Sequence, residues 1–253
     1  VILHYHELPI AARPLPEGGY EVTSIGKGLR RVTRCRELID CTGDADMVGF
    51  LGYAREDSEK RQPGTLIYHL TGYDANALNE AEVQAHYDEA LASGVLQPGD
   101  FYHKDRPFLV YLKARGGNQQ HIFNADSRTA DTQTKANILG RQSMLRMLRF
   151  VRTLPGCEKA RLEKMCSFTA VRETWRIVGE YSITYEDYMT GRLFPDAICH
   201  SFYFIDVHHE TGIHHEFLAE GVVPSIPLRA LIPLGSRHLL VAGRCLDSER
   251  RAH

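Results

Sequence analysis

Strand-like segments lie at both ends of this chain of 253 residues, and the clearest helical patterns lie between them. Residues 20–25 and 31–35 flank a Gly-Lys-Gly turn, as the two strands of a hairpin would. Residues 38–41 and 237–242 are short apolar runs that read as buried strands. Strands at both ends around a mixed interior predict an α/β domain that is interrupted by an inserted region.

The interior pattern supports this division. The polar stretch 54–64 ends in Pro63-Gly64 and indicates the crossing into a second region. Residues 131–151 carry an apolar stripe at helical spacing and end before Pro155-Gly156. The patterns predict strands over 1–3, 65–71, 107–112 and 197–207, and helices over 47–51, 79–94 and 131–151.

Composition excludes several classes of protein. The chain has 30 Lys+Arg against 32 Asp+Glu, without the basic excess of a dedicated nucleic-acid binder. No apolar run is long enough to span a membrane, and Val1-Ile2-Leu3 does not open a signal peptide. The six cysteines form no C-x-x-C pair, which favours free thiols in a reducing compartment and predicts a cytoplasmic protein.

Two segments carry candidate binding chemistry. The run Leu38-Ile-Asp-Cys-Thr-Gly-Asp-Ala-Asp46 is a strand that ends on glycine, where a ligand can approach the backbone. A helix after it, capped by Asp44 or Asp46, would offer free N–H groups to an anion. In the segment 170–181, Arg172 and Arg176 lie four residues apart, so that their guanidinium groups can clamp an anion or pair with nearby glutamates. The first segment also reads as an ordinary strand–turn–helix corner.

Histidines gather between residues 200 and 216. His208, His209, His214, His215 and Glu216 are of the types that zinc or iron would bind. Their spacing matches no mechanism, and Thr211-Gly212 between them favours a loop or hairpin. A single member such as His208 can still act as an acid or base.

Common nucleotide and hydrolase motifs are missing from the sequence. It contains no G-x-G-x-x-G, Walker A loop, H-E-x-x-H or G-x-S-x-G. The sequence Gly26-x-Gly28-x-x-Arg31 lies in the predicted hairpin turn and lacks the third glycine.

Five segments in order resemble one family. They are Ile39-Asp-Cys-Thr-Gly-Asp-Ala-Asp46, Val171-Arg-Glu-Thr-x-Arg176-Ile-x-Gly-Glu-Tyr181 with Ile183-Thr-Tyr-Glu-Asp187, Gly191-Arg-x-Phe-x-Asp-Ala-Ile198, Asp206-Val-His208, and Leu239-Leu-Val-Ala-Gly-Arg-Cys245. Together they resemble FAD-dependent oxidoreductases of the glutathione-reductase-like class, and more narrowly a bacterial group labelled as xanthan-lyase-associated.

The resemblance implies an incomplete Rossmann-like FAD/NAD(P)-binding domain with an inserted α+β substrate or cap domain. The FAD-binding parts would be residues 1–54 and 236–253, and the inserted region would be residues 55–235. FAD would be the cofactor and redox carrier. The implied partner is an unidentified small-molecule substrate, with no nucleic acid or membrane. Thr42, Gly43, Asp44, Gly243 and Arg244 would contact FAD, whereas Arg172, Glu173, Arg176 and His208 would line the substrate side.

The resemblance also implies that this chain is an interior part of a longer flavoprotein, since no Gly-rich loop for the FAD pyrophosphate is present. Two other functions stay open at this point. One is a metal-dependent enzyme built on the histidines of 208–216, and the other is a non-catalytic module derived from a flavin-binding fold.

Overall fold

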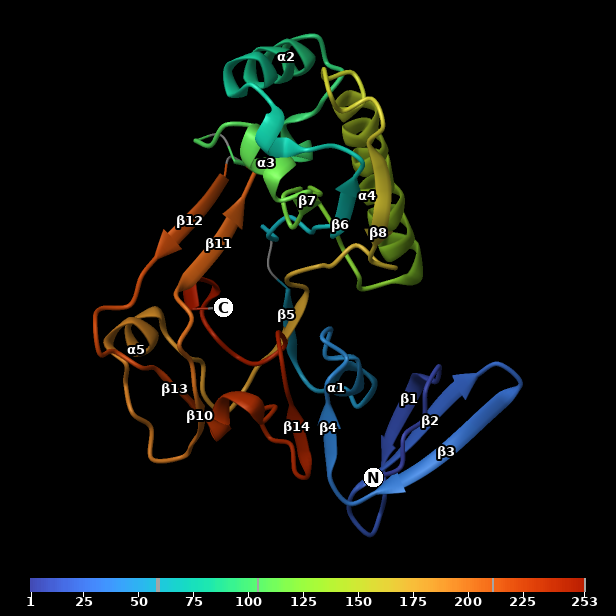
Figure 1. Cartoon of the computed structure of the whole chain (residues 1–253). Helices are drawn as coiled ribbons and strands as arrows, with labels where there is room; N and C mark the ends of the chain where they lie inside the picture. The colour runs from blue at the N-terminus through green and yellow to red at the C-terminus, as the bar shows by residue number, and fades with distance from the viewer. Residues whose placement is uncertain (58–59, 104, 211, 253) are drawn as a thin grey trace. The chain divides into compact units, whose positions relative to one another are not determined.

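Hydrogen bonding brings segments that are distant in sequence together into two separate units. The computed structural model describes residues 1–57, 60–103, 105–210 and 212–252. Unit 1 comprises Val1–Glu59, Glu173–Ile205 and Glu216–His253, and unit 2 comprises Lys60–Arg172 and Asp206–His215. Each unit mixes helices with sheets of two or three strands, so the α/β class is confirmed (Figure 1).

The units differ from the predicted domain boundaries. The first crossing, after residue 59, lies near the predicted one, whereas 173–205 and 216–235 belong to unit 1 rather than to an inserted region. The chain returns to unit 1 at β9 (Trp175–Ile177), because this strand pairs antiparallel with β5 (Arg55–Asp57) of the same unit. Which unit serves the cofactor and which the substrate stays a prediction.

Unit 1 is built around one parallel strand pair. β4 (Leu38–Asp40) pairs with β14 (Leu239–Val241), and Asp40 lies opposite Val241. Buried side chains from β14 and α1 share a core with Tyr20 and Ile177, and the partly buried Leu38 of β4 packs against it. The other elements are β1 (Leu8–Pro14), β2 (Tyr20–Gly26), β3 (Leu29–Cys35), α1 (Asp46–Phe50), α5 (Tyr185–Thr190), β10 (Ala197–His200), β13 (Ser225–Pro227) and the 3₁₀ turns η3 (Leu228–Leu231) and η4 (Arg250–Ala252). The first three form an antiparallel sheet whose β2–β3 turn is the predicted hairpin (Figure 1).

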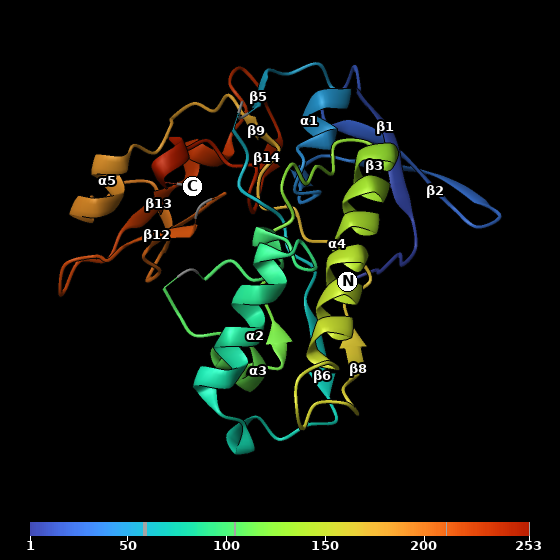
Figure 2. The same cartoon turned by 90° about the horizontal axis from the view of Figure 1, so that it is seen from above.

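Unit 2 packs helices on a small sheet. Its elements are β6 (Tyr68–Thr71), η1 (Ala75–Ala77), α2 (Glu80–Ala92), η2 (Pro98–Asp100), α3 (Leu109–Lys113), β7 (Gly116–Gly117), α4 (Ala130–Val151) and β8 (Arg161–Met165). Figures 1 and 2 show α4 running beside β6 and β8. The aromatic core of unit 2 includes Phe108, whose ring stacks on those of Tyr87 and Tyr111, with ring centroids 4.6 and 5.0 Å apart.

The predicted helices over 79–94 and 131–151 are confirmed as α2 and α4. Their N-termini are capped by side chains, since the side chain of Asn79 accepts from the Glu82 N–H and that of Thr129 from the Thr132 N–H. The histidine-rich segment forms β11 (Ile205–His209) and β12 (Gly212–Glu216), which pair with each other. Thr211 of the predicted turn lies outside the described residues.

Two strand predictions are wrong. Residues 1–3 lie in no strand, and β1 begins at Leu8. Residues 107–112 form no strand, and 109–112 lie in α3 (Leu109–Lys113) instead, because helical spacing buries Phe108, Tyr111 and Leu112 together in the core. No helix in the described part of the chain is long and apolar enough to span a membrane.

Candidate functional site

The turn after β4 is organised by one buried carboxylate. Asp40 is 1% exposed and accepts from the backbone N–H and hydroxyl of Thr42, at 3.0 and 2.7 Å. Its other oxygen accepts from the N–H groups of Met47 and Val48, at 2.8 and 3.2 Å. The hydroxyl of Thr42 accepts from the Asp46 N–H at 3.1 Å. Because these helix N–H groups are already bonded, the expectation that they would be free for an anion is wrong, and so is capping by Asp44 or Asp46.

A second carboxylate, that of Asp44, links the turn to the residues that follow β14 and precede β9. Asp44 is buried and accepts from Nη2 of Arg244 at 2.8 Å and from the hydroxyl of Thr174. The guanidinium of Arg244 also lies against Gly43, whose φ is +82°. A Cβ at Gly43 would come within 2.9 Å of Cζ of Arg244 and displace the guanidinium, and the positive φ of Gly43 itself favours glycine. The structure thus brings together the predicted residues Gly43, Asp44 and Arg244.

The two strands of the pair end at the same edge. Because β4 and β14 are parallel, their carboxyl ends lie together, and each is followed by a glycine with positive φ, Gly43 at +82° and Gly243 at +88°. Gly243 is exposed, and no atom lies within 4 Å of where its Cβ would be. Ligands of open α/β sheets bind at such carboxyl ends, and an open glycine allows close approach to the backbone.

The electrostatics of this edge favour hydroxyl groups over phosphates. Three carboxylates, Asp40, Asp44 and Asp46, share two guanidinium groups, Arg55 and Arg244. Burial, and then the charges of Asp44 and Asp40, raise the pKa of Asp46. A net negative edge repels a pyrophosphate, and its half-buried carboxylate, Asp46, can accept hydrogen bonds from sugar hydroxyls.

Arg172 and Arg176 fall in different units, so the predicted clamp stays a prediction, and each makes a hydrogen bond within its own unit. Arg172 belongs to unit 2, where its Nε donates to the carbonyl of Pro63 at 3.1 Å. Arg176 belongs to unit 1, where its Nη1 donates to the carbonyl of Ser248 at 2.9 Å. Glu173, fully buried in unit 1, lies 4.0 Å from Nε of Arg250. These contacts hold the segment around Ser248 against β9.

His208 lies in an imidazole pair that the sequence did not indicate. Its Nδ1 lies 2.8 Å from Nε2 of His121, and both side chains are 3% exposed. His121 is a lone histidine 87 residues away, so no local pattern could have found it. Burial first, and then the charge of Arg172, lower the pKa of His208 to about 4, against the opposing effect of Asp206. A neutral imidazole of this kind can accept or pass on a proton.

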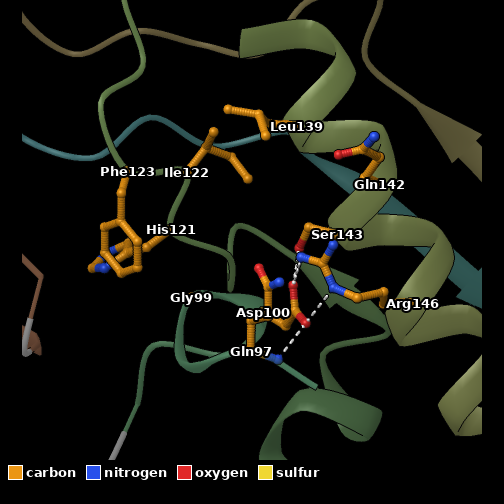
Figure 3. A pocket seen from close by; sticks show the side chains of 10 residues that line it. All are labelled: Gln97, Gly99, Asp100, His121, Ile122, Phe123, Leu139, Gln142, Ser143 and Arg146. Atoms are coloured by element: carbon orange, nitrogen blue, oxygen red, sulfur yellow. Dashed lines mark hydrogen bonds and ion pairs between the residues drawn. The ribbon is translucent and has the colours of Figure 1, made fainter. Parts of the chain in front are cut away.

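Unit 2 also contains a pocket of about 200 Å³ beside α4 (Figure 3). Its one buried carboxylate, Asp100, accepts from the hydroxyl of Ser143 and from Nε and Nη2 of Arg146 at 3.0 and 2.8 Å. The negative charge of Asp100 is therefore balanced by Arg146 within the lining of the pocket.

Metal binding finds no support. No group of three or more His, Cys, Asp or Glu in the described residues is arranged to hold a metal ion. The histidines of 208–216 lie along two paired strands rather than around one point.

Comparison with known proteins gives one match. A family model described as FAD dependent oxidoreductase matches residues 1–253. No curated protein and no solved structure matches the chain.

Proposed function

The chain belongs to the family of FAD dependent oxidoreductases, and we propose that it binds part of FAD at the edge where β4 and β14 end, in order to oxidise or reduce a small-molecule substrate. One observation supports this location above all. Two neighbouring parallel strands are each followed by a positive-φ glycine, and the space beside Gly243 is open. The remaining alternatives, a metal-dependent enzyme and a non-catalytic module, have no comparable support.

We infer that this edge contacts the sugar part of FAD. Its carboxylates exceed its guanidinium groups, so it suits hydroxyl donors better than the pyrophosphate. Gly43 and Gly243 would offer backbone at close range, while Arg244 and Asp44 hold each other in place at 2.8 Å. Thr42 would act indirectly, because its hydroxyl is bonded to Asp40 and to the Asp46 N–H.

FAD supplies the hydride or electron transfer when it is bound. The chain's own residues would orient the substrate and handle protons. Of the four side chains predicted for the substrate side, His208 is best suited to proton transfer, because its ring contacts that of His121. Burial, and then the charge of Arg172, lower the pKa of His208. The contacts of Glu173 and Arg176 within unit 1 favour a role in holding the segment near Ser248.

Two glycines on either side of β14 give a matched test of the FAD location. Gly243 follows the strand and Gly235 precedes it, both have positive φ, and neither has an atom within 4 Å of its Cβ position. Alanine therefore introduces similar backbone strain at both, of about 1–2 kcal/mol. We expect Gly243→Ala to weaken FAD binding at least tenfold and Gly235→Ala to leave it within twofold, as measured by quenching of flavin fluorescence. Equal effects of the two variants would refute this location.

A further inference from the structure

Four titratable side chains of unit 2 lie in a row from the surface to the interior. Nε2 of the exposed His215 lies 3.1 Å from Oδ1 of Asp206. Oδ2 of Asp206 lies 3.5 Å from Nε2 of His208, and Nδ1 of His208 lies 2.8 Å from Nε2 of His121. Both oxygens of one carboxylate therefore face a histidine, and both nitrogens of the His208 ring face a partner.

The two inner rings are fixed in place and enclosed. Tyr102 stacks on His121 with ring centroids 4.2 Å apart and meets His208 edge-on at 5.6 Å. The backbone N–H of His208 donates to Oε1 of Gln62 at 2.9 Å. With 3% of each inner histidine exposed, both rings are shielded from bulk water.

Both inner imidazoles are neutral near neutral pH. Burial first, and then the charges of His208 and Arg172, lower the pKa of His121 to about 3. The pKa of His208 is about 4 for the reasons given above. The charged or titratable groups that act on the pair are Arg172, Asp206, His103 and His215.

A neutral pair shares one proton across the 2.8 Å contact, and the surroundings select its position. If His208 donated from Nδ1, its bare Nε2 would face the Asp206 carboxylate. Nδ1–H of His121 would then be buried with only the backbone of His209 near it, and no hydrogen bond of normal geometry joins Nδ1 to a described residue. If His121 donates from Nε2, His208 presents Nε2–H to the carboxylate and no buried donor is left unpaired.

We propose that Asp206, His208 and His121 form a proton relay in which the Asp206 carboxylate fixes both rings as Nε2–H tautomers, leaving Nδ1 of His121 as the proton-accepting end. Its use in substrate turnover rests on the function proposed above. Asp206 and His121 are then positioning and relay residues; the sequence singled out Asp206 without giving it a role and gave no signal for His121.

The relay balances without any electron transfer. A proton taken up at Nδ1 of His121 releases the Nε2 proton to Nδ1 of His208. His208 in turn releases its Nε2 proton to Asp206, which exchanges it with solvent on the side of the exposed His215. A proton moving in the opposite direction restores the starting tautomers, which suits a redox cycle that releases and then takes up a proton.

Nitrogen NMR of the histidine rings tests the relay without any cofactor. In the wild-type protein we expect both His121 and His208 as Nε2–H tautomers between pH 6 and 8, since the pKa values of about 3 and 4 keep both neutral. Asp206→Asn should shift both rings towards Nδ1–H, because an amide N–H can donate to Nε2 of His208. His209→Gln, an exposed neighbour on the same strand, should change neither ring. An Nδ1–H tautomer for His208 in the wild type would overturn the proposal.

A second variant guards against unfolding of the first. His121→Gln should leave His208 as the Nε2–H tautomer, because the carboxylate of Asp206 remains; loss of that tautomer would overturn the proposal. In the flavin-loaded enzyme, Asp206→Asn should lower kcat at least tenfold with unchanged FAD affinity, and unchanged kcat would remove the relay from the reaction. A protein with the expected tautomers that binds no FAD would instead refute the proposed function alone.

Discussion

Replacing Asp40 tests whether one buried carboxylate holds the turn at the candidate FAD edge. Its side chain accepts from the N–H groups of Met47 and Val48 and twice from Thr42. Met47 is 3% exposed and Val48 is fully buried, so their N–H groups have no access to water when the carboxylate is removed. Thr42 is half-buried, and its donors can turn to solvent.

The expected loss follows from the two buried donors. A buried donor left without its partner costs about 2 kcal/mol, so Asp40→Ala should lower the free energy of unfolding by about 4 kcal/mol. Asp40→Asn keeps one acceptor oxygen and should lose about 2 kcal/mol. Asp74→Ala is the control, because it removes one exposed capping bond from η1 in unit 2 and should leave the unfolding of unit 1 unchanged.

Urea unfolding followed by tryptophan fluorescence measures this loss within unit 1. Trp175 is the chain's single tryptophan, and it packs against the core that contains Val48 and Leu239. Its transition should move to lower urea for both Asp40 variants, and further for alanine than for asparagine. A loss below about 1 kcal/mol for Asp40→Ala would refute the role given to this carboxylate.

Two further changes probe charge and burial. Asp46→Asn should leave stability unchanged or raised at neutral pH, because the raised pKa of Asp46 means that its ionised form destabilises the fold. In urea titrations, the difference in stability from the wild type should vanish below the ordinary pKa of aspartate. A clear loss of stability at pH 7 would contradict the assigned cause. Tyr68→Phe should lower stability by about 1–2 kcal/mol, since it leaves the buried Tyr111 hydroxyl without its partner at 2.7 Å. The double variant, with Tyr111→Phe added, should lose less stability than the sum of the two single losses. Additive losses in thermal unfolding would refute this coupling.

Local patterns were enough to predict elements with strong periodicity. The apolar stripe over 131–151 and the helical pattern over 79–94 depend on neighbours within one or two helical turns, so α4 and α2 can be predicted from the sequence. Residues 107–112 are ambiguous, because an apolar run suits a strand or a buried helix. The helix is favoured over the strand because it places Phe108 and Tyr111 together in the aromatic core of unit 2.

The candidate site was predicted only in part for the same reason. The segment 38–46 stands out locally, but its partners do not: Thr174 and Arg244 bond to Asp44 across 130 and 200 residues. Asp40 was read as part of a strand, and its capping role depends on the chain turning back over its carboxylate. His121 meets His208 only through the packing of unit 2, which no spacing in the sequence encodes.

Flavin retention tests the central claim most directly. The purified protein would be incubated with FAD, freed of unbound nucleotide, and examined for the visible absorption of oxidised flavin. We predict flavin bound at one equivalent per chain, with bleaching of the band on anaerobic reduction and its return in air. A protein that stays colourless after this treatment would contradict the account.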